Sequence, residues 1–564
     1  MRKNLLVFFA ALLVALGMAA GSARRKAHRT SAQLPAVADS ALGSISPERI
    51  RAHVRFLADD LLEGRGTGQR GGDLAAAYMA TEFALDGLNP AGDNGAYMQN
   101  VPMVGVTTLP ETTFTLVSDQ GQSIPLRLAA DVVLSNETQQ SEADVDADIV
   151  YVGYGISAPE YHWDDYKGTD VRGKVLLMLV NEPPSDDPKF FKGKALTYYG
   201  RWTYKFEEAA RRGAVAAILM HKSDMASYGW EVVRNSWSGE QAYLRSEPGP
   251  KLTAASWMQW DIARNLAATA GKNLDAMMAE ARKPEFRPLP LTVKLRAHII
   301  SRIRPFVASN VIAMLPGSDA KLKSQAVIYT AHYDHLGIVP GQAADNIYNG
   351  ALDNATGCGI LLEIARAYAS AKAKPARSIL FASVTGEEKG LLGSEYLGKH
   401  APIPASKIVL DLNYDDVPPL GVPEESEVSG AERTTFYPVV EETARDFRLS
   451  IRPDARPEAG HYYRSDHFSL ARLGIPSFSI NEGIKYKGHD SAWGIKQAED
   501  YTAKHYHQPS DEYHPDMDFA GDAVMAQFGF ALGWKAASEP AAIAWLKGDE
   551  FESTREKSMV GGQN

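Results

Sequence analysis

The sequence predicts an α/β protein with a central mixed, mostly parallel sheet flanked by helices and interrupted by an inserted β-rich unit. Three observations support this fold class. The chain has 564 residues, which is too long for one ordinary domain. After Pro305, short apolar strands alternate with helical segments, which is typical of a parallel sheet covered on both faces. Between about 105 and 300, strands and turn-rich stretches predominate instead.

The elements are expected in the following order. The first helix opens at the capping residue Ser46, which is followed by Pro47, and a second helix follows the glycine-rich turn EGRGTGQRGG. The inserted unit contains strands at 148–155 and 174–181 and a helix at 206–221 that feeds another strand. The last part of the chain alternates the strands NVIAMLP, AVIYTAHYD, SILFASVTG, IVLDLNYD and IPSFSINEG with helices at 355–373, 389–400, 433–447 and 519–538.

The pattern divides the chain into six segments. Residues 1–23 have a basic start, an apolar run and small residues, which is typical of a secretory signal peptide. The rival interpretation, an uncleaved anchor, is disfavoured because the run is shorter than the roughly 20 apolar residues that a span prefers. We therefore expect an exported protein, periplasmic or extracellular. The other segments are a linker, the start of the main domain, the inserted unit, the rest of the main domain and a tail: 24–45, 46–105, 106–300, 301–545 and 546–564.

The bulk composition argues against several classes of partner. The formal net charge of -10 argues against nucleic acid or an anionic membrane as the main partner. No segment after the signal is long and apolar enough to span a bilayer, so no stable membrane association is expected after cleavage. Cys358 is the only cysteine, which rules out an intramolecular disulfide, and its helical context favours a small buried residue over a nucleophile. The oligomeric state is left open.

Polar side chains follow the apolar strands of the predicted sheet. AVIYTA is followed by His332-Tyr333-Asp334-His335, SILFASVTG by Glu387-Glu388, and IVLDLNY by Asp415-Asp416. Asp353 lies in NGALDNATG, and His507 lies in YHQPSD far downstream. Because sites in such sheets form outside the carboxyl ends of the strands, we expect these side chains to meet at one edge.

Imidazoles and carboxylates without thiolates suit Zn²⁺ in a hydrolytic site. Five ligands around two ions require one shared carboxylate, as in two-metal hydrolases. The adjacent acids Glu387 and Glu388 also fit this chemistry. If Glu388 binds a metal, Glu387 lies beside the attacking water and can take its proton. Taken singly, each motif has an ordinary structural explanation, such as a helix cap or an N-terminal charge, but the whole set is hard to explain in that way.

The motifs AHYDHLG, NGALDNATG, TGEEKGLLGS, NYD and YHQPSD resemble, in order, those of secreted co-catalytic zinc exopeptidases of clan MH. This group contains bacterial leucyl aminopeptidases and glutamate carboxypeptidase II, and its fold is the phosphorylase/hydrolase-like zinc-exopeptidase domain. The stretch VGYGISAPEYHWDDYKGTDVRGKVLL resembles the protease-associated (PA) domain that such peptidases often carry as an insertion.

The resemblance implies a role for each matching residue. One zinc ion is expected on His332, Asp353 and Asp415, and a second on Asp353, Glu388 and His507, with Asp353 bridging. Asp334 matches the aspartate that orients the histidine ligand, and Glu387 matches the general base. The peptide bond after the bridging aspartate is cis in the family. The candidates for substrate binding are Arg464, Asp466, His467 and Tyr506. For Asp466 and His467, a structural role is about equally expected.

The resemblance implies an aminopeptidase that hydrolyses the N-terminal residues of peptides with a water activated by two zinc ions and a glutamate base. The alternatives on the same scaffold are a carboxypeptidase or dipeptidase, a glutaminyl cyclase and an inactive receptor-like homologue. For a carboxypeptidase, Arg464 lies in the expected region, but the sequence shows no convincing arginine cluster. Cobalt or manganese also suits such ligands, so the native metal is left open.

Overall fold

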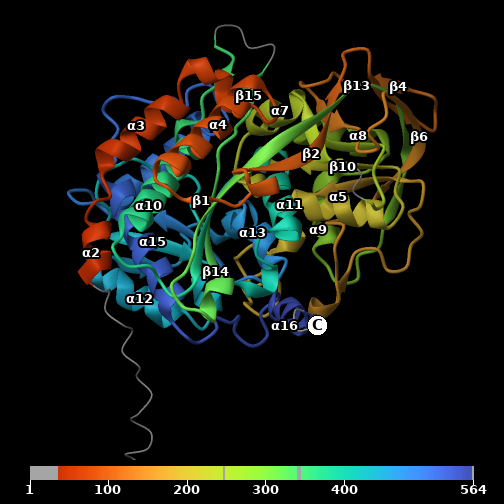
Figure 1. Ribbon diagram of the computed structural model, residues 1–564. Coiled ribbons are helices and arrows are strands. Elements are labelled where there is room, and N and C mark those ends of the chain that lie inside the picture. The colour runs from red at the N-terminus through yellow and green to blue at the C-terminus, as the bar shows by residue number, and fades with distance from the viewer. Residues whose placement is uncertain (1–35, 246–247, 340–344, 562–564) are drawn as a thin grey trace, which may run out of the picture.

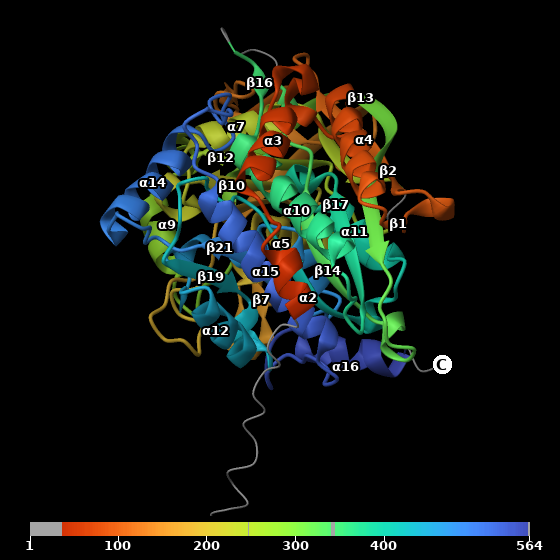
Figure 2. The same cartoon turned by 60° about the vertical axis from the view of Figure 1, so that its left-hand side comes forward.

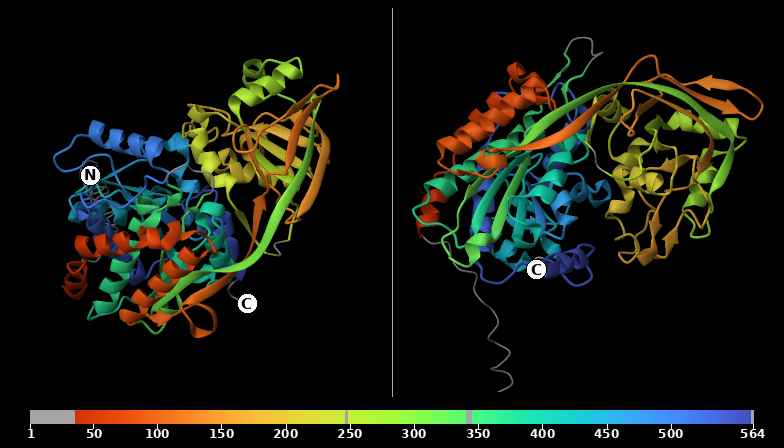
Figure 3. Two further views of the ribbon diagram at one scale, coloured as in Figure 1. Left: turned by 90° about the horizontal axis from the view of Figure 1, so that it is seen from above. Right: turned by 45° about the vertical axis from the view of Figure 1, so that its right-hand side comes forward.

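The computed structural model describes residues 36–245, 248–339 and 345–561, and it shows two packed units joined by one long strand (Figure 1). The predicted signal peptide and the start of the predicted linker lie outside the described residues. Strand β13 (Leu289–Leu315) belongs to both units: its first part pairs with β3 and β6, and its last part pairs with β2 and β17. Figure 3 shows this strand running from one unit to the other. We call residues 113–300 the inserted unit and the remainder the metal-bearing unit.

The metal-bearing unit is built on a mixed sheet in the order β2–β13–β17–β14–β18–β21–β19–β20. Strand β14 runs parallel to β17 and β18, and β18 runs parallel to β21, whereas β13 and β19 are antiparallel to their neighbours β17 and β21. The fold class predicted from the sequence is therefore confirmed. The strands are β1 (Asn89–Pro90), β2 (Met98–Thr108), β14 (Ala326–His332), β15 (Gly337–Ile338), β16 (Ile347–Tyr348), β17 (Ser378–Val384), β18 (Ile408–Asn413), β19 (Glu425–Ser429), β20 (Ser450–Arg452) and β21 (Ser477–Glu482).

Helices cover both faces of this sheet because alternate residues of its buried strands point to opposite sides. In β14, Val327 and Tyr329 belong to the larger core, while Ala326 and Ile328 belong to the smaller one. Helices of the larger core lie together in Figure 2. They are α2 (Ala36–Leu42), α3 (Pro47–Leu57), α4 (Arg70–Leu85), α10 (Gly357–Ser370), α12 (Tyr437–Asp446) and α15 (Ala520–Ser538). The opposite face carries α11 (Leu392–His400) and α13 (His467–Ala471), and α14 (Ser491–Lys504) flanks the carboxyl edge near the site.

The inserted unit has its own sheet, in the order β4–β3–β13–β6–β9–β10–β12–β5, with a hydrophobic core on each side. Its strands are β3 (Thr113–Ser118), β4 (Ser123–Pro125), β5 (Val132–Ser135), β6 (Glu142–Tyr151), β7 (Ser157–Ala158), β8 (Trp163–Asp164), β9 (Val175–Leu179), β10 (Ala216–His221) and β12 (Ala254–Gln259). Its helices are α5 (Trp202–Arg211), α6 (Ser223–Ala226), α7 (Trp230–Ser238), α8 (Trp260–Thr269) and α9 (Leu274–Ala281). Strand β11 (Gln241–Leu244) leaves this sheet and pairs with β2.

Three local expectations were wrong. The helix expected at 206–221 ends at Arg211, and 216–221 form the buried strand β10, because Gly213 with φ +76° ends the helix. Residues 36–42 of the expected linker are helix α2, whose Ala38 and Ala41 pack into the larger core. The expected C-terminal tail contains α16 (Glu552–Gly561), where Arg555 donates hydrogen bonds to the carbonyls of Ala405 and Ile408.

The two units are also joined by side chains. Arg304 of β13 pairs with Glu240 of the inserted unit at 2.6 Å and donates a hydrogen bond to the Gly68 carbonyl.

Within the described ranges, none of the helices combines the length and apolarity that crossing a membrane requires.

Candidate metal centre

The candidate site lies where three parallel strands end. Strand β14 ends at His332, β17 ends three residues before Glu387, and β18 ends two residues before Asp415. Because these strands are parallel, their carboxyl ends lie at one edge of the sheet, and the side chains that follow them converge there.

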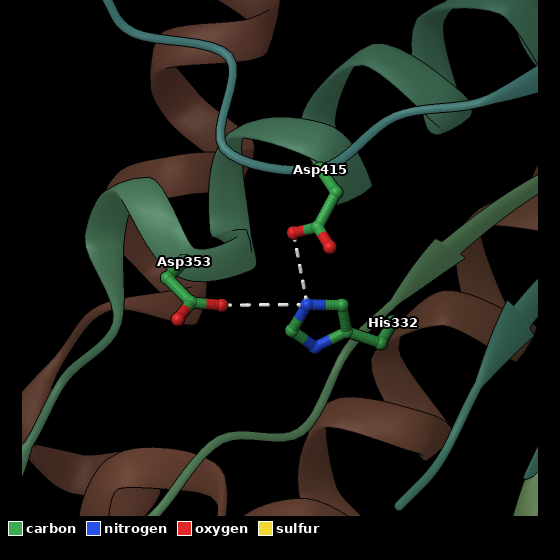
Figure 4. Close-up of side chains that lie close together, drawn as sticks. All are labelled: His332, Asp353 and Asp415. Atoms are coloured by element: carbon green, nitrogen blue, oxygen red, sulfur yellow. Dashed lines mark hydrogen bonds and ion pairs between the residues drawn. The ribbon is translucent and has the colours of Figure 1, made fainter. Parts of the chain in front are cut away.

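The first group of donors consists of His332, Asp353 and Asp415, shown in Figure 4. His332 Nε2 lies 3.0 Å from Asp415 Oδ1 and 3.3 Å from Asp353 Oδ1. All three side chains are buried or nearly so, with exposed fractions of 1%, 5% and 13%.

The second group shares Asp353 with the first. His507 Nε2 lies 3.3 Å from Asp353 Oδ2 and 3.1 Å from Glu388 Oε2. Asp353 therefore presents Oδ1 to one histidine and Oδ2 to the other, which is the arrangement of a carboxylate that bridges two cations.

Hydrogen bonds fix both histidine tautomers. His332 Nδ1 lies 3.0 Å from the backbone carbonyl of Asp334, which can only accept, so Nδ1 carries the proton. His507 Nδ1 lies 2.8 Å from Ser236 Oγ, whose own proton goes to the Val232 carbonyl, so Nδ1 is again the donor. In both rings Nδ1 is thus engaged by the protein, and Nε2 is the nitrogen that faces the site, as it must be in a metal ligand held in this way.

The loop that carries Asp353 is held in place by hydrogen bonds to the motif YHQPSD. Its own amide and that of Leu352 donate hydrogen bonds of 3.1 and 3.0 Å to the carboxylate of Asp511, the aspartate of YHQPSD. The Asp353–Asn354 peptide bond is cis. The segment that carries the shared donor is thus tied directly to the segment that carries His507.

The carboxylate of Asp334 makes a different contact from the one expected. It accepts hydrogen bonds of 2.6 Å from Thr385 Oγ1 and from the Gly386 amide, and the orienting contact to His332 comes from the Asp334 carbonyl instead. Its side chain therefore anchors the turn that presents Glu387. Glu387 is half-buried and lines the wall of the adjoining cavity.

The site has strongly shifted pKa values. Burial and the neighbouring carboxylates of Glu388 and Asp415 raise the pKa of Glu387 well above its usual range, although His332 opposes them. Burial also opposes ionisation of Glu388, but the imidazoles of His507 and His335 lower its pKa to about 2. Burial alone would lower the pKa of His507, whereas the carboxylates of Glu388 and Asp353 raise it to about 10. Adjacent glutamates thus have opposite proton affinities.

The donor set fits a divalent cation such as Zn²⁺. Buried polar atoms normally have hydrogen-bond partners, yet Glu388 Oε1 and His507 Nε2 have none among the described residues. Their neighbours are further imidazole and carboxylate donors: His335 Nδ1 lies 2.7 Å from Glu388 Oε1, and His507 Nε2 lies 3.3 Å from Asp353 Oδ2 and 3.1 Å from Glu388 Oε2. The two distances from His507 are close to the spacing of about 3.4 Å between ligands of one tetrahedral zinc ion. Oxygen and nitrogen donors without thiolates are the set expected for a hydrolytic zinc site.

Two cavities adjoin the donors. The larger one has a volume of about 620 Å³. It is lined by Asp353, Glu387 and Asp415, by the segments after β18, β19 and β21, and by α14. The smaller one, of about 100 Å³, is lined by Glu387 and Glu388 and by residues of α5 and α7 of the inserted unit.

The four predicted substrate residues are placed differently. Arg464 and Tyr506 line both cavities, and the Tyr506 ring stacks on His507 at 4.0 Å. Asp466 and His467 are fully buried and line neither of these two cavities. Their burial away from both cavities favours a structural role over substrate binding.

Three residues near the donors had no role in the sequence analysis. His335 lies beside Glu388 and Asp353, Ser236 holds His507, and Arg201 lines the smaller cavity. His335 was visible as part of HYDH. Ser236 and Arg201 precede the family-like segment and carry no motif.

The fold and the site together define a metallopeptidase-like α/β domain. An aminopeptidase from Aneurinibacillus sp. strain AM-1 has the same overall fold, with a TM-score of 0.51 at 18% identity over 91% of this chain and 98% of that one. Residues 310–527, which contain both groups of donors, match the model of peptidase family M28.

Curated relatives align over parts of the chain. A "probable zinc metalloprotease" of Pyrenophora tritici-repentis is 34% identical over 131 residues, 22% of this chain and 26% of the relative. A "glutamate carboxypeptidase 2 homolog" of Caenorhabditis elegans is 23% identical over 309 residues, 48% of this chain and 37% of the relative. The chain thus spans between a quarter and two fifths of the length of these two relatives.

Proposed function

We propose that the protein is an exported zinc-dependent aminopeptidase that hydrolyses the N-terminal residues of peptides with two zinc ions per chain. The observation that carries this proposal is the position of Glu387: its carboxylate stands beside two groups of cation donors that share Asp353, and it lines a cavity large enough for a residue of substrate. The M28 match and the aminopeptidase fold of the Aneurinibacillus protein support this choice.

In this proposal, His332, Asp353 and Asp415 hold one zinc ion, and Asp353, Glu388 and His507 hold the other. Bound zinc supplies Lewis-acid chemistry: it polarises the scissile carbonyl and lowers the pKa of a nucleophilic water. The protein contributes the orientation of these donors, through the Asp334 carbonyl, Ser236 and Asp511.

Glu387 is the proton carrier. Its carboxylate accepts the proton of the attacking water and returns it to the nitrogen of the departing amine. Asp334 contributes by anchoring Thr385 and Gly386, which fix the turn on which Glu387 stands.

Aminoacyl-p-nitroanilides test the proposal. We expect zinc-dependent release of nitroaniline from substrates with a free α-amino group, lost on chelation and restored by zinc. Matched N-acetylated substrates should be inert. Equal hydrolysis of acetylated and free substrates would show that the enzyme is not an aminopeptidase, and no hydrolysis of any of them would contradict the proposal as a whole.

One observation favours a second candidate, a dipeptidase or carboxypeptidase. The structure places Arg201 of the inserted unit beside Arg464, and both line the smaller cavity with Glu387. Neither Nε has a hydrogen-bond partner among the described residues, and burial together with Arg464 lowers the pKa of Arg201 to about 10. Two half-buried guanidinium groups suit a substrate carboxylate, and a cavity of about 100 Å³ leaves little room beyond the leaving residue.

Matched peptides separate the two candidates. An aminopeptidase should cleave Ala-Ala and Ala-Ala-amide comparably, whereas a dipeptidase or carboxypeptidase should strongly prefer the free acid. Arg201→Met should abolish that preference and leave the cleavage of the amide unchanged. Comparable cleavage of acid and amide by the wild type would exclude the second candidate.

The inserted unit resembles a PA domain, and we propose that it supports the centre as well as covering it. Its contribution is the contact of Ser236 and Asn235 with His507. Export is proposed on the signal-like start of the chain.

A further inference from the structure

His335 is a fully buried imidazole at the centre that the expected ligand sets leave out. It follows β14 by three residues, and its amide donates a hydrogen bond of 3.1 Å to the Arg65 carbonyl. Its ring packs directly on Gly350, where any Cβ would lie 2.8 Å from the ring and where φ is +58°. This close packing fixes the ring where it is.

The buried guanidinium of Arg65 holds both chain segments around that ring. It donates hydrogen bonds of 2.7 Å to the Tyr333 carbonyl and of 2.9 Å to the Gly350 carbonyl. These carbonyls belong to the segments that carry His335 and Asp353. The separation of the two side chains is therefore set by a rigid element and not by a mobile loop.

The contact between His335 and the donors is not that of a hydrogen bond. Nδ1 lies 2.7 Å from Glu388 Oε1 and 3.7 Å from Asp353 Oδ2. Even so, Nδ1, Nε2 and Glu388 Oε1 all lack a directional hydrogen-bond partner among the described residues. Nδ1 of His335 and Oε1 of Glu388 are therefore close to each other without the geometry of a hydrogen bond. Two ligands that face a common cation are arranged in this way.

Four contacts join His335, Asp353, His507 and Glu388. Three of them, of 3.7, 3.3 and 3.1 Å, scatter around the value of about 3.4 Å expected between ligands of a tetrahedral zinc ion, and the fourth, between His335 and Glu388, is shorter at 2.7 Å. The two histidine rings meet edge to face, with centroids 5.6 Å apart. The donors thus approach from distinct directions.

We infer that His335 is a fourth protein ligand of the metal position formed by Asp353, Glu388 and His507. This inference rests on the proposed metal-dependent function and makes the two positions unequal. The position with His335 is closed by four side chains, as structural zinc sites are, while the position of His332, Asp353 and Asp415 keeps one coordination site open. The closed position should therefore hold its ion more tightly and exchange it more slowly.

Metal release tests the inference without measuring activity. Wild-type protein that contains two zinc ions should lose them to a chelator in two phases, one fast and one slow. His335→Asn should convert the slow phase into a fast one, with a loss of affinity of about 10–100-fold or more. His489→Asn, a change at an exposed histidine, is the matched control and should leave both phases unchanged.

A second measurement needs no variant. X-ray absorption on wild-type protein loaded with one equivalent of zinc should count two imidazoles around the ion. One imidazole would overturn the inference, as would an unchanged slow phase in folded His335→Asn, and His335 would then be a hydrogen-bonding neighbour of Glu388. Both failures leave the proposed peptidase intact provided that the wild type binds zinc and cleaves its substrates. A wild type that binds no zinc would overturn both.

Discussion

The inserted unit and the metal-bearing unit both bury charged side chains, but they treat them differently. In the inserted unit, Lys205 is fully buried and donates hydrogen bonds of 2.5 and 2.7 Å to the carbonyls of Tyr154 and Asn181. Asp165 accepts from a backbone amide and from the Trp163 indole. These charged groups are satisfied within their own unit.

In the metal-bearing unit, several buried donor atoms near the strand ends are left without such partners. Glu388 Oε1, His335 and His507 Nε2 lack hydrogen bonds among the described residues, and they face one another. Burying polar groups in this way costs stability unless a ligand compensates it. The comparison teaches that burial and charge alone do not mark a ligand site. At the strand ends, the distinguishing feature is that unpartnered donor atoms of several side chains face one another.

The largest expected effect is on turnover. Glu387→Gln should lower kcat by about 10²–10⁴-fold because it removes the proton carrier, and zinc content should stay at the wild-type level. In chelator-treated protein, the same change should raise the free energy of unfolding by about 1 kcal/mol because it removes one of several crowded carboxylates. Steady-state kinetics, metal analysis and denaturant titration check these three points. Glu395→Gln, at a surface ion pair, is the control. Loss of zinc along with turnover would show that Glu387 is a ligand.

The next effect is on the inserted unit. Lys205→Met should lower the free energy of unfolding by about 3 kcal/mol, because two buried carbonyls and Asp165 lose their cationic partner. Denaturant titration measures this loss, and Lys272→Met, an exposed lysine of the same unit, should be neutral. If Lys205→Met were neutral as well, the contrast between the two units would be broken.

A third prediction concerns the contact that crosses between the units. Ser236→Ala should lower zinc affinity by about 10–100-fold, because His507 loses the acceptor that fixes its tautomer. Metal-buffer titration measures the affinity, and Ser236→Thr, which keeps the hydroxyl, should restore it. An affinity unchanged in Ser236→Ala would mean that the inserted unit plays no part in holding the metal.

The smallest effect is a pH dependence that both units should share. Burial lowers the pKa of His53 in the metal-bearing unit and of His221 in the inserted unit to about 4 each. The unfolded chain takes up a proton below about pH 6.5, whereas the folded protein does not until about pH 4, so stability falls as the pH falls through this window. At pH 5.5 each histidine should cost about 1.2 kcal/mol relative to neutral pH.

Denaturant titrations between pH 7 and pH 5 check this effect. His53→Gln and His221→Gln should each flatten the acid side of the stability curve. A curve that steepens after either change would mean that the histidine is charged in the folded protein.

Much of the site was predictable because its chemistry is local in sequence. Strand patterns followed by His332, Glu387 and Asp415 indicate one edge of a parallel sheet, and the structure brings these side chains to that edge. Both the strand pattern and the position just after the strand can be seen within a dozen residues.

What the sequence did not reveal depends on contacts between distant segments. Ser236 meets His507 across 271 residues, and Arg201 reaches Arg464 from the inserted unit, so neither has a local pattern. Helix α2 was missed because its described fully buried residues, Ala38 and Ala41, are small and form no apolar stripe of the usual kind. The contact of Asp334 was misjudged because spacing does not distinguish a carboxylate from a backbone carbonyl as the partner of a ring nitrogen.

The most direct measurement is anomalous scattering at the zinc absorption edge, which locates bound zinc ions. The crystals should be grown with zinc from protein purified without chelators. Our interpretation predicts two peaks on either side of the Asp353 carboxylate, one within bonding distance of His332 and Asp415 and the other of Glu388 and His507, and both should disappear in Asp353→Ala. Peaks remote from Asp353, or two peaks that persist in the variant, would contradict it.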